Sequence, residues 1–70
     1  MESALLATVR YLNEKEAAAL TGLAVQTLRN LRFKGKGPPY CKIGRSVRYP
    51  LTDLLTWIEG FRVQHQDQSR

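Results

Sequence analysis

The sequence predicts a small α/β fold in which two short helices, a two-stranded hairpin and a third helix follow one another along the chain. Three patterns lead to this fold class. They are a helix-capping sequence at residues 13–16, period-two alternation at residues 40–49, and an amphipathic stripe at residues 54–61. The chain has 70 residues, of which 43% are hydrophobic. This is enough for one small packed domain and too little for a large buried active site.

The first helix is predicted to run from about residue 14 to residue 20. Asn13 can cap its N-terminus, and Glu16, three residues further on, can close a capping box. Leu12 and Ala17 stand where a hydrophobic staple would fix the entry of the chain into the helix. Acidic residues in the first turn are favoured there by the helix dipole.

Gly22 is predicted to end the first helix with a positive φ, and a second helix from about Val25 to Phe33 follows at once. Ala24 stands at the N-cap position and cannot cap, which costs about 0.5–2 kcal/mol relative to serine. The helical period divides the side chains near this helix into two sets. Those expected to face inward are Leu23, Leu28 and Leu31. Those expected to face outward are Gln26, Arg29, Asn30 and Lys34.

Residues 34–39 form a basic, turn-rich connection that cannot continue the helix. Two short strands, at residues 40–43 and 46–49, are then predicted around Gly44 and Arg45. The apolar face of this hairpin is expected to carry Cys41, Ile43, Val47 and Tyr49, and its basic face Lys42 and Arg48. Cys41 is accordingly expected to be a small buried residue.

Pro50 is predicted to end the second strand, and Thr52 to cap a third helix with Asp53 in its first turn. The apolar stripe of this helix is expected to pack in the core, and it consists of Leu54, Trp57, Ile58 and Phe61. Gly60 can either end the helix or lie within it. Tyr40 and Tyr49 are expected in the core or at the hairpin edge, and Phe33 either packs under the hairpin or lies exposed.

Positive charge is concentrated in the middle of the chain. The net charge is +5, from 11 basic and six acidic residues, and the pI is about 9.9. No acidic residue occurs between Ala17 and Thr52, whereas that stretch holds seven cations, Arg29, Arg32, Lys34, Lys36, Lys42, Arg45 and Arg48. Such a field repels itself unless a polyanion is the intended neighbour. The pattern predicts nucleic-acid binding, with a solvated basic surface as the alternative.

Several other classes of protein are not expected. One cysteine permits no internal disulfide and fits a reducing cytoplasm, and no apolar run approaches the length of a membrane span. Cys41 and His65 alone lack the number and spacing of metal ligands. No catalytic constellation or phosphate-binding loop occurs, so we expect no enzyme, cofactor or small-molecule ligand. The folded domain is predicted at residues 11–63, between a flexible segment (1–10) and a flexible tail (64–70).

Two short helices joined by a glycine turn suggest a helix-turn-helix, with Ala18 as the small residue where the helices cross. Further motifs make the pattern more specific: Glu16-Ala17-Ala18, Gly22-Leu23, Thr27-Leu28, Gly37-Pro38-Pro39-Tyr40, Lys42-Ile43-Gly44-Arg45, Val47-Arg48-Tyr49 and Asp53-Leu54. Together with Tyr11-Leu12, they resemble the excisionase-type winged helix-turn-helix domains. These include AlpA-like prophage regulators and are related to the DNA-binding domains of MerR-type regulators. The resemblance covers about residues 11–61, and Thr21 departs from it because a larger apolar residue is usual there.

The resemblance implies that the second helix enters the major groove of DNA and that the hairpin, the wing, lies against the backbone or minor groove. On the recognition helix it implies base-edge contacts from Gln26, Thr27, Arg29 and Asn30. Backbone contacts are expected from Arg32, Lys34 and Lys36, and wing contacts from Lys42, Arg45, Ser46 and Arg48. Thr27 can alternatively bond its own backbone. The acids that open helices, Glu14, Glu16 and Asp53, are expected outside the DNA face.

The implied function is sequence-specific binding of double-stranded DNA without catalysis. We expect an excisionase, that is, a recombination directionality factor of a prophage or mobile element, because the chain is little more than the domain. An AlpA-like transcriptional regulator is the alternative, and a protein-interaction module is a third reading. Expected partners are DNA, an integrase or recombinase, and further copies bound cooperatively. Such a protein would be bacterial or phage-encoded, cytoplasmic and associated with the nucleoid.

Overall fold

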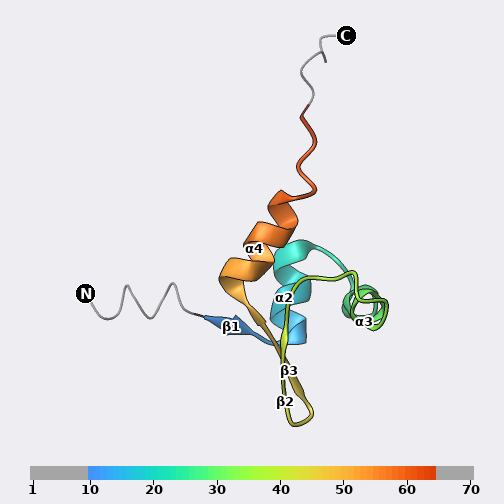
Figure 1. Ribbon diagram of the computed structural model, residues 1–70, viewed down its shortest axis with the longest axis vertical. Coiled ribbons are helices and arrows are strands. Elements are labelled where there is room, and N and C mark those ends of the chain that lie inside the picture. The colour runs from blue at the N-terminus through green and yellow to red at the C-terminus, as the bar shows by residue number, and fades with distance from the viewer. Residues whose placement is uncertain (1–9, 65–70) are drawn as a thin grey trace, which may run out of the picture.

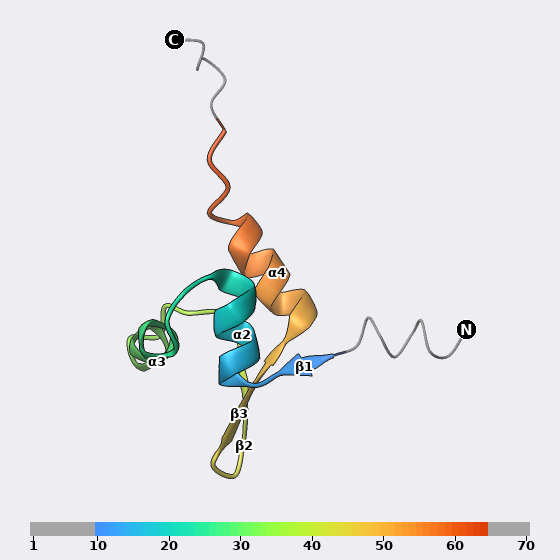
Figure 2. The same cartoon turned by 180° about the vertical axis from the view of Figure 1, so that it is seen from behind.

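The computed structural model describes residues 10–64, which form a three-helix domain with a small antiparallel sheet (Figures 1 and 2). Along the chain the elements are β1 (Tyr11–Leu12), α2 (Glu14–Thr21), α3 (Val25–Phe33), β2 (Cys41–Ile43), β3 (Ser46–Pro50) and α4 (Leu51–Glu59). The strand order is β1-β3-β2. The predicted winged helix-turn-helix fold is confirmed. The predicted flexible ends fall largely on residues 1–9 and 65–70, including His65, which lie outside the described residues.

Helix α2 begins at the predicted capping box. The Asn13 side chain accepts a hydrogen bond from the Glu16 amide at 2.8 Å, and the Glu16 carboxylate accepts one from the Asn13 amide at 2.9 Å. The helix continues one residue beyond its predicted end, to Thr21. There the threonine hydroxyl donates to the Ala17 carbonyl at 2.9 Å and accepts from the Leu23 amide at 3.2 Å. The residue that departs from the family pattern thus satisfies backbone groups at the turn.

The turn between α2 and α3 has the predicted geometry. Gly22 adopts φ 77° and its amide bonds to the Ala18 carbonyl at 2.8 Å, a left-handed conformation that glycine adopts without steric cost. Helix α3 has its predicted bounds, and the side chain of Ala24 makes no capping hydrogen bond. Leu28 is fully buried, and the four side chains predicted to face outward are exposed. Helix α3 therefore presents a polar face beside the body of the domain (Figure 1).

The two faces of the hairpin differ from the predicted ones. Lys42 pairs with Val47, and Cys41 pairs with Arg48. Directly paired residues share a face of the sheet, so Lys42 lies on the face of the buried Val47, and Arg48 lies on the opposite face. The prediction placed odd-numbered residues of both strands on the same face. Across a two-residue turn, with Gly44 at φ 62°, an odd-numbered residue of one strand instead pairs with an even-numbered residue of the other, and the two share a face.

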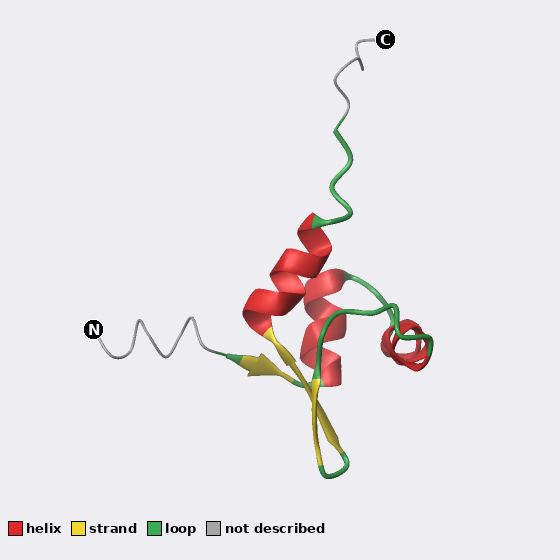
Figure 3. Cartoon of the chain, in the orientation of Figure 1, coloured by secondary structure: helices red, strands yellow, loops and turns green. Residues whose placement is uncertain are grey.

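This register exposes side chains that were expected in the core. The predictions that Cys41 and Ile43 are buried were wrong, because Cys41 is exposed and 67% of Ile43 is accessible. Val47 and Tyr49 are buried as predicted. The protruding part of the hairpin therefore has little apolar cover on either side, and it projects from the body as a wing (Figure 3).

Strand β1 was not anticipated. Tyr11 and Leu12 pair with Pro50 and Tyr49 on the edge of β3 that β2 leaves open. The amide of Leu51 extends this contact by donating to the carbonyl of Arg10 at 2.8 Å. The entering chain is thereby fixed to the strand that carries the wing.

Helix α4 follows β3 without a loop. The prediction that Thr52 caps it was wrong, because Pro50 occupies the N-cap position with extended φ and ψ and the helix begins at Leu51. Gly60 follows the last helical residue, Glu59, which resolves the open alternative. Leu54 is buried, but the prediction that Phe61 is in the core was wrong. It is 64% exposed and packs edge-on against Trp57 at 4.8 Å between ring centres.

The hydrophobic core joins every element except β2. Its members are Leu12, Ala17, Leu28, Val47, Tyr49 and Leu54. They come from β1, α2, α3, β3 and α4, and Ala18, Leu23, Leu51, Trp57 and Ile58 pack around them. One core therefore sets the position of α3 and of the base of the wing.

The missing N-cap of α3 gives a prediction about stability. Ala24 already has the extended backbone of an N-cap residue, with φ −73° and ψ 151°, so a serine hydroxyl there can accept from an amide of the first turn. Ala24→Ser should raise the free energy of unfolding by about 0.5–2 kcal/mol, as measured by urea denaturation. Ala19→Ser, on the exposed side of α2, is the control and should be neutral or slightly destabilising. Equal effects of both serines would contradict the capping argument.

Candidate nucleic-acid interface

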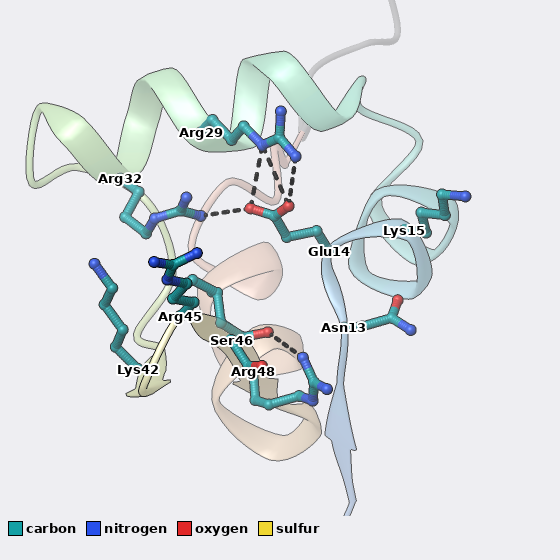
Figure 4. A pocket seen from close by; sticks show the side chains of 10 residues that line it. Asn13, Glu14, Lys15, Arg29, Arg32, Lys42, Arg45, Ser46 and Arg48 are labelled. Atoms are coloured by element: carbon teal, nitrogen blue, oxygen red, sulfur yellow. Dashed lines mark hydrogen bonds and ion pairs between the residues drawn. The ribbon is translucent and has the colours of Figure 1, made fainter.

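A cation-lined cleft lies between the start of α2, helix α3 and the wing (Figure 4). Its volume is about 440 Å³. The lining residues are Asn13, Glu14, Lys15, Arg29, Arg32, Lys42, Arg45, Ser46, Val47 and Arg48. Glu14 is the only acid among them. Two of the three segments were predicted to bind DNA, and the structure brings them to one cleft.

The predicted base-reading residues divide between two flanks of α3. Gln26, Arg29 and Asn30 are exposed, and the Gln26 amide donates to the Asn30 side chain at 3.1 Å. Thr27 lines a groove on the other flank, together with Lys36. The structure therefore does not bring Thr27 and Lys36 into the cation-lined cleft.

The second flank is a largely apolar groove with a volume of about 570 Å³. It is lined by Thr21, Leu23, Thr27, Leu31, Lys36, Trp57, Ile58 and Phe61. The groove lies between the helix-turn-helix and α4. Lys36 is the one cation among its lining residues.

Glu14 links α2 to α3 at the centre of the cation-lined cleft. One carboxylate oxygen accepts from Arg29 Nη2 at 2.9 Å and from Arg29 Nε at 3.2 Å, and the other lies 3.1 Å from Arg32 Nη1. The side chain of Glu14 is only 21% exposed. The expectation that Glu14 lies outside the face formed by these arginines was wrong. Its favourable position in the first turn of α2 also directs it toward α3, 15 residues further along the chain.

Arg32 belongs both to the cleft and to the packing of the domain. Its Nη1 donates to the hydroxyl of Tyr49 at 2.9 Å, and its guanidinium lies 5.5 Å from the ring centre of Tyr40. The second arrangement is a cation–π contact. Tyr49 is itself fully buried, so the guanidinium of Arg32 is attached to the core through one hydrogen bond.

The wing contributes three exposed polar side chains, Lys42, Arg45 and Ser46. Arg45 stands at the hairpin turn beside Gly44, and Lys42 lies on the sheet face that it shares with Val47. Arg48 is half-buried and donates to the carbonyl of Val47 at 2.9 Å. Lys34 follows α3 and is exposed, with its amide bonded to the carbonyl of Asn30 at 3.1 Å.

A second cleft extends this surface along α3 toward Tyr40. It has a volume of about 470 Å³ and is lined by Gln26, Arg29, Arg32, Phe33, Tyr40 and Lys42. Phe33 is 91% exposed, which resolves the alternative that the sequence left open. Sequence reasoning did not assign Glu14, Lys15, Phe33 or Tyr40 to this surface. A helical wheel signals only Phe33, which stands seven residues after Gln26 on the same face.

The electrostatics of the cleft follow from its ion pairs. The hydrogen bond from Arg29 lowers the pKa of Glu14, partial burial opposes this change, and the pairing with Arg32 lowers the pKa further. The same hydrogen bond to Glu14 raises the pKa of Arg29. All three groups are therefore charged near neutral pH, and the cleft is suited to hold an anionic backbone.

Within residues 10–64, no three His, Cys, Asp or Glu side chains gather as a metal ion requires. None of the helices in this part combines the length and the apolar character needed to cross a membrane.

The chain is similar to a known protein family. Residues 11–62 match the family described as a helix-turn-helix domain. This range contains β1, both helices of the turn, the wing and α4. No curated protein sequence matches the chain.

The lowered pKa of Glu14 gives a prediction about pH. Above its ordinary value of 4.5 the carboxylate contributes its full stabilisation, and this contribution is lost as pH falls through the lower folded value. The wild type should therefore lose more stability than Glu14→Gln between about pH 5 and pH 3, as measured by thermal unfolding. Glu59, whose pKa the hydrogen bond from Arg62 also lowers, is present in both proteins and cancels in the comparison. Parallel pH curves would contradict the assigned role of the Glu14 pair.

Proposed function

The chain belongs to the helix-turn-helix domain family of the excisionase and AlpA type, and we propose that it recognises a specific duplex DNA sequence as an excisionase. Members of this family bind DNA. The observation that carries the proposal is the cation-lined cleft between α3 and the wing, with Arg29 on the exposed face of α3.

In the proposed complex, α3 lies in the major groove. Arg29 is suited to the two acceptors of guanine, O6 and N7, and Gln26 or Asn30 to the paired acceptor and donor of adenine. Arg32, Lys42 and Arg45 line the cleft on one flank of α3 and are proposed to hold one phosphate strand. Thr27 and Lys36 lie on the other flank, where the second strand would pass. Lys34, Ser46 and Arg48 add contacts to the backbone.

The excisionase role rests on the size of this surface. One recognition helix and one wing bury about 600–1,000 Å² of protein surface, as single DNA-binding modules do. Tight binding then requires several copies on repeated sites or a partner protein. An excisionase works in this way beside an attachment site, where it bends the DNA and directs an integrase toward excision. The cytoplasm and the nucleoid of a bacterial cell are the proposed place of action.

The role can be tested in a reconstituted excision reaction. The protein is added to the integrase proposed as its partner and to a plasmid that carries the two hybrid attachment sites of that integrase. Excision that requires this protein supports the excisionase role. Activity only at a promoter of the same mobile element would instead identify a transcriptional regulator of the AlpA type. A failure to bind any duplex in a salt-dependent way would contradict DNA binding and favour a protein-interaction module.

The recognition-helix assignment predicts the effect of Arg29→Ala. The preferred duplex is first selected from a random library with the full chain. Loss of a bidentate guanine contact should then cost about 1–3 kcal/mol on that duplex and relax the preference at one base position. Titration of duplexes that differ at single positions measures both effects. Unchanged preference at every position would show that Arg29 does not read a base.

The wing assignment predicts a different effect for Arg45→Ala and Lys42→Ala. Loss of a phosphate contact should weaken binding to all sequences alike and reduce the salt slope by about one. Arg62→Ala is the matched control, because Arg62 lies after α4 and pairs with Glu59 at 2.7 Å rather than with the cleft. Equal salt slopes for the wing variants and for this control would contradict the proposed role of the wing.

A further inference from the structure

One acid stands in the middle of a surface proposed to bind a polyanion. Glu14 lines the cleft together with Lys15, Arg29, Arg32, Lys42, Arg45 and Arg48. Its side chain is 21% exposed, whereas the side chain of its partner Arg29 is 49% exposed. An acid at this position lowers the attraction of the cleft for phosphate, so its presence calls for a physical reason.

We propose that Glu14 is a specificity-determining residue, which holds Arg29 in the orientation that reads guanine and keeps DNA phosphates away from the base-reading part of α3. This inference rests on the proposed function. It deepens that function by assigning a role to an acid on α2, the helix that does not enter the groove.

The orientation follows from which edge of the guanidinium Glu14 occupies. The carboxylate accepts from Nε at 3.2 Å and from Nη2 at 2.9 Å, so it takes the side edge of Arg29. The end of the guanidinium, formed by Nη1 and the second proton of Nη2, is left for an external acceptor. Within residues 10–64, Arg29 Nη1 has no hydrogen-bond partner, and Figure 4 shows all the bonds of Arg29 directed to Glu14. A free end edge is the fork that matches O6 and N7 of guanine.

The second part of the role is electrostatic. Without Glu14, Arg29 would be an additional unpaired cation beside the wing that could neutralise a phosphate of any sequence, and Arg32 would attract phosphate more strongly. With Glu14, part of their charge is already neutralised inside the protein. Contacts to phosphate are weakened in every complex, whereas the guanine contact is made only on the correct site. The net effect is a higher ratio of specific to non-specific affinity.

A purely structural role explains the arrangement less well. Helix α3 is already attached to the domain through the fully buried Leu28 and through the hydrogen bond from Arg32 to Tyr49. Arg29 lies outside these contacts, and its side chain is half exposed. Its bonds to Glu14 therefore order one interface side chain more than they hold the fold together.

The test is Glu14→Gln, which keeps the size of the side chain and removes its charge. Dissociation constants are measured on the selected duplex and on an unrelated duplex, over a range of salt concentrations. Affinity for the unrelated duplex should rise, with a salt slope steeper by up to about 0.9 for one additional phosphate contact. The ratio of specific to non-specific affinity should fall about tenfold, within the range of one bidentate base contact.

Glu59→Gln is the matched control. Glu59 also forms a two-bond pair with an arginine, to Arg62 at 2.7 and 2.8 Å, but at the end of α4. Glu59→Gln removes the same charge as Glu14→Gln, but at a place away from the cleft. The ratio of specific to non-specific affinity should therefore stay close to that of the wild type. An equal fall in both variants would mean that net charge alone is responsible, and it would overturn the inference.

Two further variants separate orientation from charge. Glu14→Asp keeps the charge on a shorter side chain, so it should retain weak non-specific binding and lose part of the guanine preference. In an Arg29→Ala background, Glu14→Gln should no longer change the preference at the position read by Arg29. A guanine analogue without the N7 acceptor at that position should likewise remove the effect of Glu14→Gln on preference.

The outcomes distinguish this inference from the proposed function. A wild type without base preference would contradict the proposed function itself. A wild type whose preference is relaxed by Arg29→Ala but not by Glu14→Gln, with an unchanged salt slope, would overturn the role of Glu14 alone. Far-ultraviolet circular dichroism and thermal unfolding show whether each variant is folded. If Glu14→Gln does not fold, Glu14→Asp still tests the inference through the guanine preference.

Discussion

The hydrogen bond between Arg32 and Tyr49 connects the hydrophobic core of the domain to its basic surface. Tyr49 is fully buried, its backbone pairs with Leu12 of β1, and its hydroxyl accepts from Arg32 at 2.9 Å. A buried hydroxyl without a partner would be costly, so the tyrosine and the arginine satisfy each other. Because β3 also forms one strand of the wing, this bond adds a polar link between α3 and the wing to the contact that the core already makes.

A chain of polar contacts leads from this bond to the exposed face of α3. Arg32 also contacts Glu14 at 3.1 Å, and Glu14 in turn accepts from Arg29. The side chain of Tyr49 is fully buried, those of Arg32 and Glu14 are each 21% exposed, and that of Arg29 is 49% exposed. A residue that reads a base must be both accessible and held in place. Through this chain of contacts Arg29, the proposed base reader, meets both requirements without a rigid loop.

The sequence predicted what depends on neighbours along the chain and missed what depends on the tertiary structure. The capping box at Asn13, the turn at Gly22 and the bounds of α3 were correct because each is decided within a few residues. Strand β1 was missed because two residues carry no periodicity and its partner, Pro50, is remote. The faces of the hairpin were wrong because alternation within each strand does not say which positions of the two strands pair across the turn. Likewise, the Glu14 pair depends on how α2 crosses α3, which no local spacing records.

Charge repulsion within the acid-free middle of the chain must be reduced by the protein itself when no DNA is bound. Clustered cations destabilise the compact state when no polyanion is bound, and Arg29, Arg32, Lys42 and Arg45 meet around one cleft. The neutralising group comes from outside that stretch, from Glu14 at the start of α2. It can be supplied there because the first turn of a helix already favours an acid. One carboxylate thus complements the dipole of α2 and reduces the repulsion between the arginines. The wing cations Lys42, Arg45 and Arg48 form no ion pair within residues 10–64 and remain available for the proposed contacts to the DNA backbone.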